Sequence, residues 1–365
     1  MLNIKAFKQS WLSKDNELIT NLVSKSSDNN VYALGRNSVS ELLINKLNLV
    51  AVIDDFEETE TTWHDLPIIK SKELPEGAIA INCSLSVKPR VAEQVLKSTN
   101  AQNVIRYAEL HQHSPELFPI PEPQQARYKN YLTHEDSWAK IYNLLEDEQS
   151  KELFINILKF NATADYTFIG DQNFAPEQQY FEDFMNYNNE IFVDAGGFTG
   201  DTTEIFCNKY PDYNKVYVFE PSPVNINQAK ENLAQFERIY YEEKGVSDQV
   251  SKMTFDPHAG SASSAKQSGD NLITIETTTI DECFNSAVTF IKMDLEGWEP
   301  HALAGAKKMI REHTPKLAIS VYHNDNDMWA IAEQILGYNE NYKLYLRHYT
   351  EGWSETIMYF LPKAK

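Results

Sequence analysis

An α/β fold with two domains is predicted by two observations. Short apolar strands alternate with helices along both halves of the chain, and residues 191–221 contain a complete β-α-β unit. In this unit an apolar strand ends at Asp194, a loop with three glycines follows (Gly196, Gly197 and Gly200), and a second apolar strand ends at Glu220. Glycines let a ligand approach the main chain closely, and an acid at the end of the second strand can accept ribose hydroxyls. The unit therefore predicts a site for a nucleoside-containing ligand.

Residues 1–110 predict a small α/β domain. Residues 1–26 have helical spacing, and a strand then enters a turn at Gly35. Strands are expected at 31–34, 49–53, 66–69, 78–81 and 103–105, and helices at 39–47 and 87–98. Because helices separate the strands, we expect a parallel sheet.

Residues 111–180 predict a linker followed by a helical bridge. Four prolines lie close together (Pro115, Pro119, Pro121 and Pro123), a composition that suits neither a helix nor a central strand. Residues 133–160 then carry apolar side chains at helical spacing.

Residues 181–365 predict the larger domain. Its parallel strands are expected at 191–194, 216–220, 238–241, 288–293 and 316–322. Antiparallel pairs are expected at 252–255 with 272–278, and at 342–347 with 356–361. Helices are expected at 201–209, 225–236, 280–284, 300–311 and 327–336, the second of them opened by Ser222-Pro223.

Composition excludes several classes of partner. The formal net charge of the 365 residues is -20, which disfavours nucleic acid and anionic membranes. The three cysteines, Cys83, Cys207 and Cys283, lie far apart, which suits a reducing compartment and indicates neither a zinc site nor a disulfide framework. We find no signal peptide and no apolar run near ~18 residues. A cytoplasmic protein without a membrane span is therefore expected.

The glycine loop discriminates between nucleoside ligands. Its sequence D-A-G-G-F-T-G-D, at 194–201, does not match the dinucleotide pattern G-x-G-x-x-G. Asp201 at the start of the following helix stabilises the helix dipole but would repel a phosphate. A phosphate-free, positively charged ligand such as S-adenosylmethionine suits this loop better than a dinucleotide. The alternative is an ordinary strand-loop-helix that binds nothing.

Further motifs resemble those of one enzyme family. They are D-A-G-G-F-T-G-D-T at 194–202, F-E-P-S-P at 219–223, G-V-S-D at 245–248, I-K-M-D-L-E-G-W-E at 291–299 and P-K-L-A-I-S-V-Y-H at 315–323. In order and spacing, the chain resembles the FkbM-type methyltransferases, a branch of the class I S-adenosylmethionine-dependent methyltransferases, over roughly residues 130–362. The family often has Asn where this chain has Phe198.

The resemblance implies a Rossmann-like sheet of seven strands, the last antiparallel, with S-adenosylmethionine as cofactor. Asp194, Gly196 and Gly197 are expected near its methionine portion, Glu220 at the ribose, and Val246 beside adenine. The remaining cofactor-binding residues implied are Phe198, Thr199, Asp201, Thr202, Pro221 and Asp294.

The N-terminal domain resembles, more weakly, the small Rossmann-like domain of some sugar-modifying enzymes. The matching pieces are the Gly35 turn, I-D-D at 53–55 and L-P-I-I at 66–69. The loop G-R-N-S lacks the further glycines of a phosphate cradle, although Arg36 could contact a phosphate. The alternative is a spacer or dimerisation domain that binds no nucleotide.

Three residues are expected to carry the chemistry. Asp294 and Glu296 lie two apart at a strand end, so in a continuing strand they would point the same way. His323 follows the next strand and has a side chain suited to proton removal. The candidates for the base are His323 and Asp294, and the alternative for Glu296 is a hydrogen bond to the turn after it.

Other polar residues receive structural interpretations. His301 opens a helix, and His348 is expected to face solvent late in an edge strand. The run N-D-N-D at 324–327 lacks the EF-hand spacing and suits a helix N-terminus. No metal ligand is therefore expected.

The sequence thus predicts a methyltransferase that acts on a hydroxyl of a sugar, glycan or glycosylated metabolite, with assembly into a homo-oligomer left open. The alternatives are an N-methyltransferase and a non-catalytic protein that binds a nucleoside or nucleotide sugar. A dinucleotide oxidoreductase is disfavoured by the loop.

Overall fold

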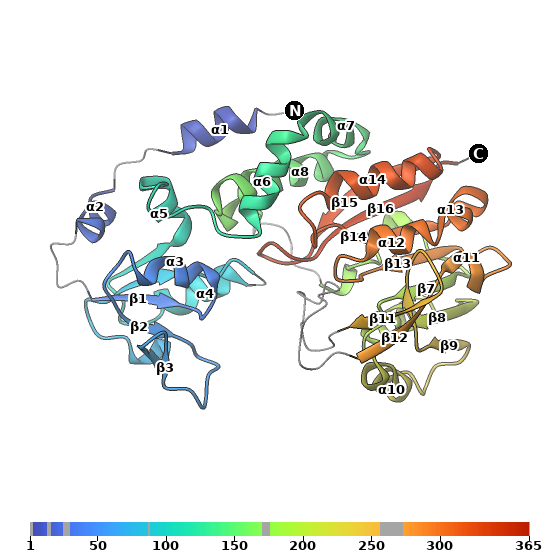
Figure 1. Ribbon diagram of the computed structural model, residues 1–365, viewed down its shortest axis with the longest axis horizontal. Coiled ribbons are helices and arrows are strands. Elements are labelled where there is room, and N and C mark those ends of the chain that lie inside the picture. Colours follow the sequence, from blue (N-terminus) through green and yellow to red (C-terminus); the bar gives the residue numbers. More distant parts are fainter. Residues whose placement is uncertain are drawn as a thin grey trace. The chain divides into compact units, whose positions relative to one another are not determined.

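The computed structural model describes residues 3–12, 16–24, 30–86, 88–169, 176–255 and 273–364. The chain divides into two compact units. The first comprises Met1–Glu135, Glu152–Phe174 and Tyr349–Ser354, and the second Asp136–Lys151, Ala175–His348 and Glu355–Lys365. Each unit has its own central sheet (Figure 1).

The sheet of the first unit has the order β3-β4-β2-β1-β5-β6. Five strands pair in parallel as predicted: β1 (Val31–Leu34), β2 (Leu49–Ile53), β4 (Leu66–Ile69), β5 (Ile79–Asn82) and β6 (Asn103–Arg106). A short strand that the sequence did not indicate, β3 (Thr62–Trp63), pairs antiparallel with β4. Tyr32, Ile53 and Leu96 are among the buried side chains that form its core.

Short helices complete this unit. They are α1 (Ile4–Trp11), α2 (Glu17–Val23), α3 (Ser38–Ile44), α4 (Pro89–Lys97), α5 (Tyr107–His113) and α6 (Gln124–Thr133), with single 3-10 turns at η1 (Ser71–Glu73) and η2 (Tyr166–Phe168). Residues 114–123, all within the described chain, form neither helix nor strand, as the prolines predict. Two more helices follow α6, namely α7 (Glu135–Leu144), of the same length, and the longer α8 (Glu148–Thr163).

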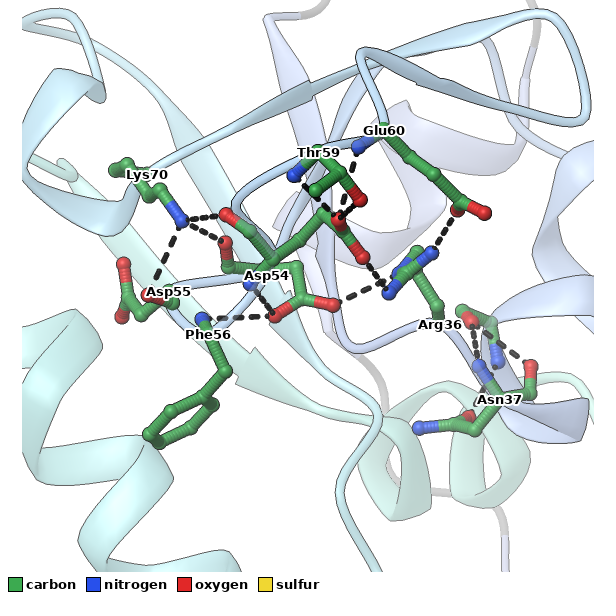
Figure 2. Close-up of polar contacts among 10 residues, drawn as sticks. Arg36, Asn37, Asp54, Asp55, Phe56, Thr59, Glu60 and Lys70 are labelled. Atoms are coloured by element: carbon green, nitrogen blue, oxygen red, sulfur yellow. Dashed lines mark hydrogen bonds and ion pairs between the residues drawn. The ribbon is translucent and has the colours of Figure 1, made fainter.

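The turn after β1 is closed by an ion cluster (Figure 2). The Arg36 guanidinium donates to Asp54 Oδ2 over 2.8 Å and also contacts the carboxylates of Glu57 and Glu60. Lys70 Nζ donates to the main-chain carbonyl of Asp54 over 3.2 Å. A phosphate at Arg36 would meet three carboxylates, so this arrangement favours the alternative of a domain that binds no phosphate at this loop.

A buried histidine in α5 predicts how the stability of the first unit depends on pH. His111 Nδ1 lies 2.7 Å from the carbonyl oxygen of Phe118, and burial lowers the pKa of His111 to about 4. The unfolded chain, with an ordinary value near ~6.5, then binds more protons between these two values. Up to about 3 kcal/mol of stability is expected to be lost as the pH falls from ~6.5 to ~4.

The measurement is urea denaturation of the wild type and of His111→Leu between pH 7 and 4.5. The variant removes the titrating group, so its stability should change less with pH. The exposed His134, the residue that follows α6, serves as control, and His134→Gln should keep the wild-type pH dependence. Equal pH dependence in wild type and His111→Leu contradicts the prediction.

The sheet of the second unit has seven strands in the order β15-β16-β14-β13-β7-β8-β9. Five are parallel neighbours: β7 (Ile191–Ala195), β8 (Lys215–Phe219), β9 (Ile239–Glu242), β13 (Phe290–Met293) and β14 (Lys316–Ser320). The last strand, β16 (Thr356–Pro362), runs antiparallel to both β14 and β15 (Tyr342–His348). The expectation of seven strands with the last antiparallel is confirmed.

Three short strands form a second, small sheet in this unit. They are β10 (Gly245–Val246), β11 (Ser251–Phe255) and β12 (Ile273–Thr278), with β11 antiparallel to β12 as predicted. The helices are α9 (Asp201–Lys209), α10 (Pro223–Asn232), α11 (Ile280–Cys283), α12 (Glu299–Ala304), α13 (Lys307–His313) and α14 (Asp327–Tyr338), with 3-10 turns η3 (Pro176–Gln178) and η4 (Asp183–Met185).

Two expectations for this unit are wrong. The helix expected at 300–311 is divided into α12 and α13, because Asp281 accepts the main-chain N–H groups of Lys308 and Met309, each over 2.8 Å, and so opens a new helix. His348 does not face solvent: its side chain is buried beside Thr356, with Nδ1 2.9 Å from the hydroxyl. Edge position alone does not expose a side chain when other elements cover that face.

Candidate functional site

A cavity of about 420 Å³ lies where the parallel strands of the second unit end. The carboxyl ends of β7, β8, β13 and β14 meet at this edge of the sheet, the edge at which open α/β sheets bind ligands. Seven residues singled out from the sequence line the cavity: Gly196, Phe198, Asp201, Thr202, Glu220, Asp294 and Glu296.

Six other predicted site residues lie outside the lining. Asp194 and Val246 are buried within β7 and β10, and His323 is buried beside Asp294. Gly197 faces the β8 side chains, and the Thr199 carbonyl accepts a hydrogen bond on the far side of the loop. Pro221 lines a neighbouring cavity of about 790 Å³, which shares Phe198 and Asn225 with the first.

An ion pair is buried beneath the glycine loop. Lys292 Nζ lies 3.0 Å from Asp194 Oδ1 and donates to the Gly196 carbonyl over 2.7 Å. Asp194 Oδ2 accepts from the Thr203 hydroxyl over 2.7 Å. Burial raises the pKa of the Asp194 carboxyl, and the Lys292 ammonium opposes that rise. The pair ties β7, the loop and β13 together and places a positive charge at the cavity wall.

Glu220 holds the other side of the loop. Its Oε2 accepts from the Phe198 N–H over 3.1 Å, and its Oε1 accepts from the Ser222 N–H over 2.9 Å. Burial raises the pKa of Glu220, while these donors lower it. Phe198 therefore contributes its main chain to the site, and its side chain, 57% exposed, lies between the two cavities.

Asp294 and Glu296 both face the cavity, but not for the reason predicted. The strand does not continue through them: β13 ends at Met293, and Glu296 has a left-handed backbone with φ of 53°. Burial alone would raise the pKa of Asp294, but the neighbouring His323 and Lys292 charges lower it. Burial raises the pKa of Glu296.

Two tyrosines orient the carboxylates at the cavity. The Tyr180 hydroxyl donates to Asp294 Oδ2 over 2.7 Å, and the Tyr322 hydroxyl donates to Glu355 Oε1 over 3.1 Å. Burial and the Asp294 charge raise the pKa of Glu355. Five of the described lining residues are acidic (Asp201, Glu220, Asp294, Glu296 and Glu355). Lys292 is the one basic residue among the described residues of the lining.

His323 lies among three carboxylates. Its Nε2 is 3.5 Å from both Asp294 Oδ1 and Glu296 Oε2, and its Nδ1 is 3.1 Å from Glu299 Oε1. Burial alone would lower the pKa of His323, but these carboxylates, Glu299 foremost, raise it to about 9. Its side chain is 3% exposed, so it reaches the cavity only through its neighbours.

Several residues of the site were missed by the sequence analysis, namely Gln179, Tyr180, Asn225, Lys292, Glu299, Tyr322 and Glu355. A lysine inside an otherwise apolar buried strand was a usable signal for Lys292. Glu299 lies within the quoted motif I-K-M-D-L-E-G-W-E. Glu355 lies in a loop and offers no local pattern.

Two structural interpretations agree with the contacts. In the N-D-N-D run, Asp327 Oδ2 accepts from the Asn324 N–H over 2.6 Å where α14 begins. His301 stacks on Trp298 with ring centroids 4.2 Å apart, and its Nδ1 lies 3.5 Å from Asp248 Oδ2. Within the described residues, no helix combines the length and apolar character needed to cross a bilayer.

Comparison with known proteins finds one family model and several solved structures that are similar to this chain. Residues 188–349 match the model of the methyltransferase FkbM domain. The crystal structure of methyltransferase FkbM from Methylobacillus flagellatus KT is similar, with a TM-score of 0.75 and 21% identity over 98% of each chain. No curated protein sequence matches this chain.

Smaller structural overlaps are found with other solved structures. An rRNA methylase from Streptococcus thermophilus matches with a TM-score of 0.35 and 16% identity over 53% of this chain and 99% of that one. Aeropyrum pernix fibrillarin, in complex with natively bound S-adenosyl-L-methionine, matches with a TM-score of 0.32 and 9% identity over 48% of this chain and 67% of that one. Residues 188–349 are thus similar to the methyltransferase FkbM domain, and the chain shares its fold with an FkbM methyltransferase.

Proposed function

We propose that this protein binds S-adenosylmethionine in the cavity at the sheet edge and transfers its methyl group to a hydroxyl of a sugar, glycan or glycosylated metabolite. The observation that carries the proposal is the charge of the lining, with five acids and one lysine arranged around a glycine loop. Such a lining attracts a sulfonium and an ammonium and disfavours a pyrophosphate. It therefore supports the methyl donor over a dinucleotide.

Two lining residues fix the orientation of the cofactor. Lys292 is the basic group that can pair with the cofactor's carboxylate: an ammonium has three donors, and the described contacts use two of them. Glu220, at the end of β8, is placed to accept the ribose hydroxyls. A cofactor held at both ends in this way would present its methyl group on the side of Asp294 and Glu296.

The transfer is an in-line displacement. The acceptor oxygen would form a bond to the methyl carbon while the carbon–sulfur bond breaks. The electron pair of the carbon–sulfur bond stays on sulfur, so the cofactor leaves as S-adenosylhomocysteine. The hydroxyl proton passes to a carboxylate that faces the cavity, either Asp294 or Glu296. His323 is assigned a positioning role, because it does not line the cavity and touches Asp294 and Glu296 instead.

The polar wall favours a sugar-like acceptor. Gln179 donates to Glu355 Oε2 over 2.6 Å, and Glu355 also accepts from Tyr322. Carboxylates fixed in this way present further lone pairs to the hydroxyls of a ligand. An acceptor with several adjacent hydroxyls would use them.

Calorimetry with S-adenosylmethionine, S-adenosylhomocysteine and NAD tests the cofactor assignment. The first two should bind and NAD should not. Glu220→Gln, which removes the charge but keeps the shape, should weaken S-adenosylhomocysteine binding by about tenfold, since hydrogen bonds to charged groups contribute ~1.5–3 kcal/mol.

Glu231→Gln is the matched control, because Glu231 is an exposed acid on α10, outside the cavity lining. Its affinity should equal that of the wild type. Tight NAD binding without a response to either methyl-donor ligand would exclude the proposed function.

A further inference from the structure

The cluster around His323 contains buried polar atoms whose close contacts do not have hydrogen-bond geometry. Among the described residues, both ring nitrogens of His323 are buried without a hydrogen bond of suitable angle, and so are Glu296 Oε2 and Glu299 Oε2. Nearly all buried polar atoms in proteins are paired, and a cluster of exceptions indicates a bound water or ion. One cation placed among them would satisfy several at once.

The donor atoms have the spacing that one ion needs. Ligand atoms of Asp294, Glu299 and His323 all lie within 4.8 Å of one another. Ligands of one octahedral ion lie ~3 Å apart when adjacent and ~4.2 Å apart when opposite, so the three groups would draw together around a bound ion. Glu299 is 0% exposed and His323 3%, so these groups are fixed by packing rather than gathered on the surface.

The three residues come from separate parts of the second unit. Asp294 follows β13, Glu299 begins α12 and His323 follows β14. Asp294 and Glu299 lie five residues apart in the motif at 291–299, but His323 is distant in the sequence, and no recognised metal-binding spacing joins the three.

We propose that Asp294, Glu299 and His323 bind a divalent transition-metal ion, such as Mn²⁺, at the wall of the methyl-transfer cavity. A set of one imidazole and two carboxylates suits such ions better than Mg²⁺, which prefers oxygen ligands and retained waters. Three protein ligands leave further positions of the ion for water or substrate. Because Asp294 lines the cavity, the ion would lie at the cavity wall.

The ion would act on the acceptor as a Lewis acid, and this part of the inference rests on the proposed function. Coordination of the hydroxyl oxygen lowers its pKa, and its proton passes to Glu296, whose Oε2 lies 3.5 Å from His323 Nε2. The oxygen then forms its bond to the methyl carbon, and the sulfur leaves with the electron pair. This arrangement does not require His323 to accept a proton.

The test is a Mn²⁺ titration of the 365-residue protein. Metals are first removed with a chelator, and electron paramagnetic resonance then reports the binding of added Mn²⁺. We expect one Mn²⁺ per chain, with affinity at least tenfold lower in His323→Ala and in Glu299→Gln. His301→Ala is the control, because His301 forms an exposed pair with Asp248 outside the cluster and its loss should leave the affinity unchanged.

Crystals grown with Mn²⁺ provide a measurement that does not depend on the folding of a variant. Anomalous scattering should place the ion in contact with Asp294, Glu299 and His323. Absence of stoichiometric binding by the wild type, or an ion located elsewhere, overturns the inference in favour of a protonated His323 held by its carboxylates. S-adenosylhomocysteine binding, measured on the same preparation with chelator present, separates this failure from failure of the proposed function.

Discussion

Replacement of Lys292 by Met is expected to lower the free energy of unfolding of the second unit by about 3–5 kcal/mol. Asp194, its partner at 3.0 Å, is fully buried and would be left as an uncompensated charge beneath the glycine loop. Asp194→Asn should cost a similar amount for the converse reason. The Gly196 carbonyl also loses its donor when Lys292 is replaced.

The double variant Asp194→Asn/Lys292→Met should recover much of this loss, because neither charge then remains buried alone. The measurement is urea denaturation of the four proteins in a double-mutant cycle. Lys140→Met is a matched control: Lys140 Nζ also lies 3.0 Å from a carboxylate, that of Glu333, but on the surface, where such pairs contribute ~0–1 kcal/mol. A cost for Lys292→Met no larger than for Lys140→Met would contradict the prediction.

The parallel strands could be predicted because buried strands are continuous apolar runs that end in polar residues. Leu49–Ile53, which is followed by Asp54, and Lys316–Ser320 follow this pattern, Val31–Leu34 is an apolar run that ends at the Gly35 turn, and the glycine loop marks the first turn of the larger sheet. The antiparallel last strand was inferred from family resemblance and alternation together. These features are local, so one sequence suffices to find them.

The chemistry of the cavity depends on contacts that no local pattern reports. Glu355 reaches the site from the loop before β16, and Tyr180 from the segment before β7. His323 was identified by its place after β14, but its burial between Asp294 and Glu299 favours the proposed positioning role over that of a free base. Packing among distant segments decides such roles, and the sequence alone does not fix that packing.

Gly196→Ala is expected to abolish detectable S-adenosylhomocysteine binding, with a loss of more than about a hundredfold, or ~2.7 kcal/mol. Gly196 has φ of 80°, and a Cβ atom there would lie 2.0 Å from the main-chain carbonyl oxygen of Asp294. The loop would have to move away from the end of β13. This movement would take the Gly196 carbonyl away from Lys292 and would displace the part of the cavity wall that the loop forms. Calorimetry gives the affinity, and thermal unfolding shows whether the fold survives.

Gly337→Ala separates this effect from the mere addition of a methyl group. Gly337 lies in α14, with nothing within 4 Å of the added Cβ and an ordinary helical backbone. The substitution should raise the free energy of unfolding by about 0.5–1 kcal/mol and leave S-adenosylhomocysteine binding unchanged. If Gly196→Ala instead kept its affinity within about threefold of the wild type, a difference of ~0.7 kcal/mol, the close approach of the loop to Asp294 would not be what shapes the cofactor site.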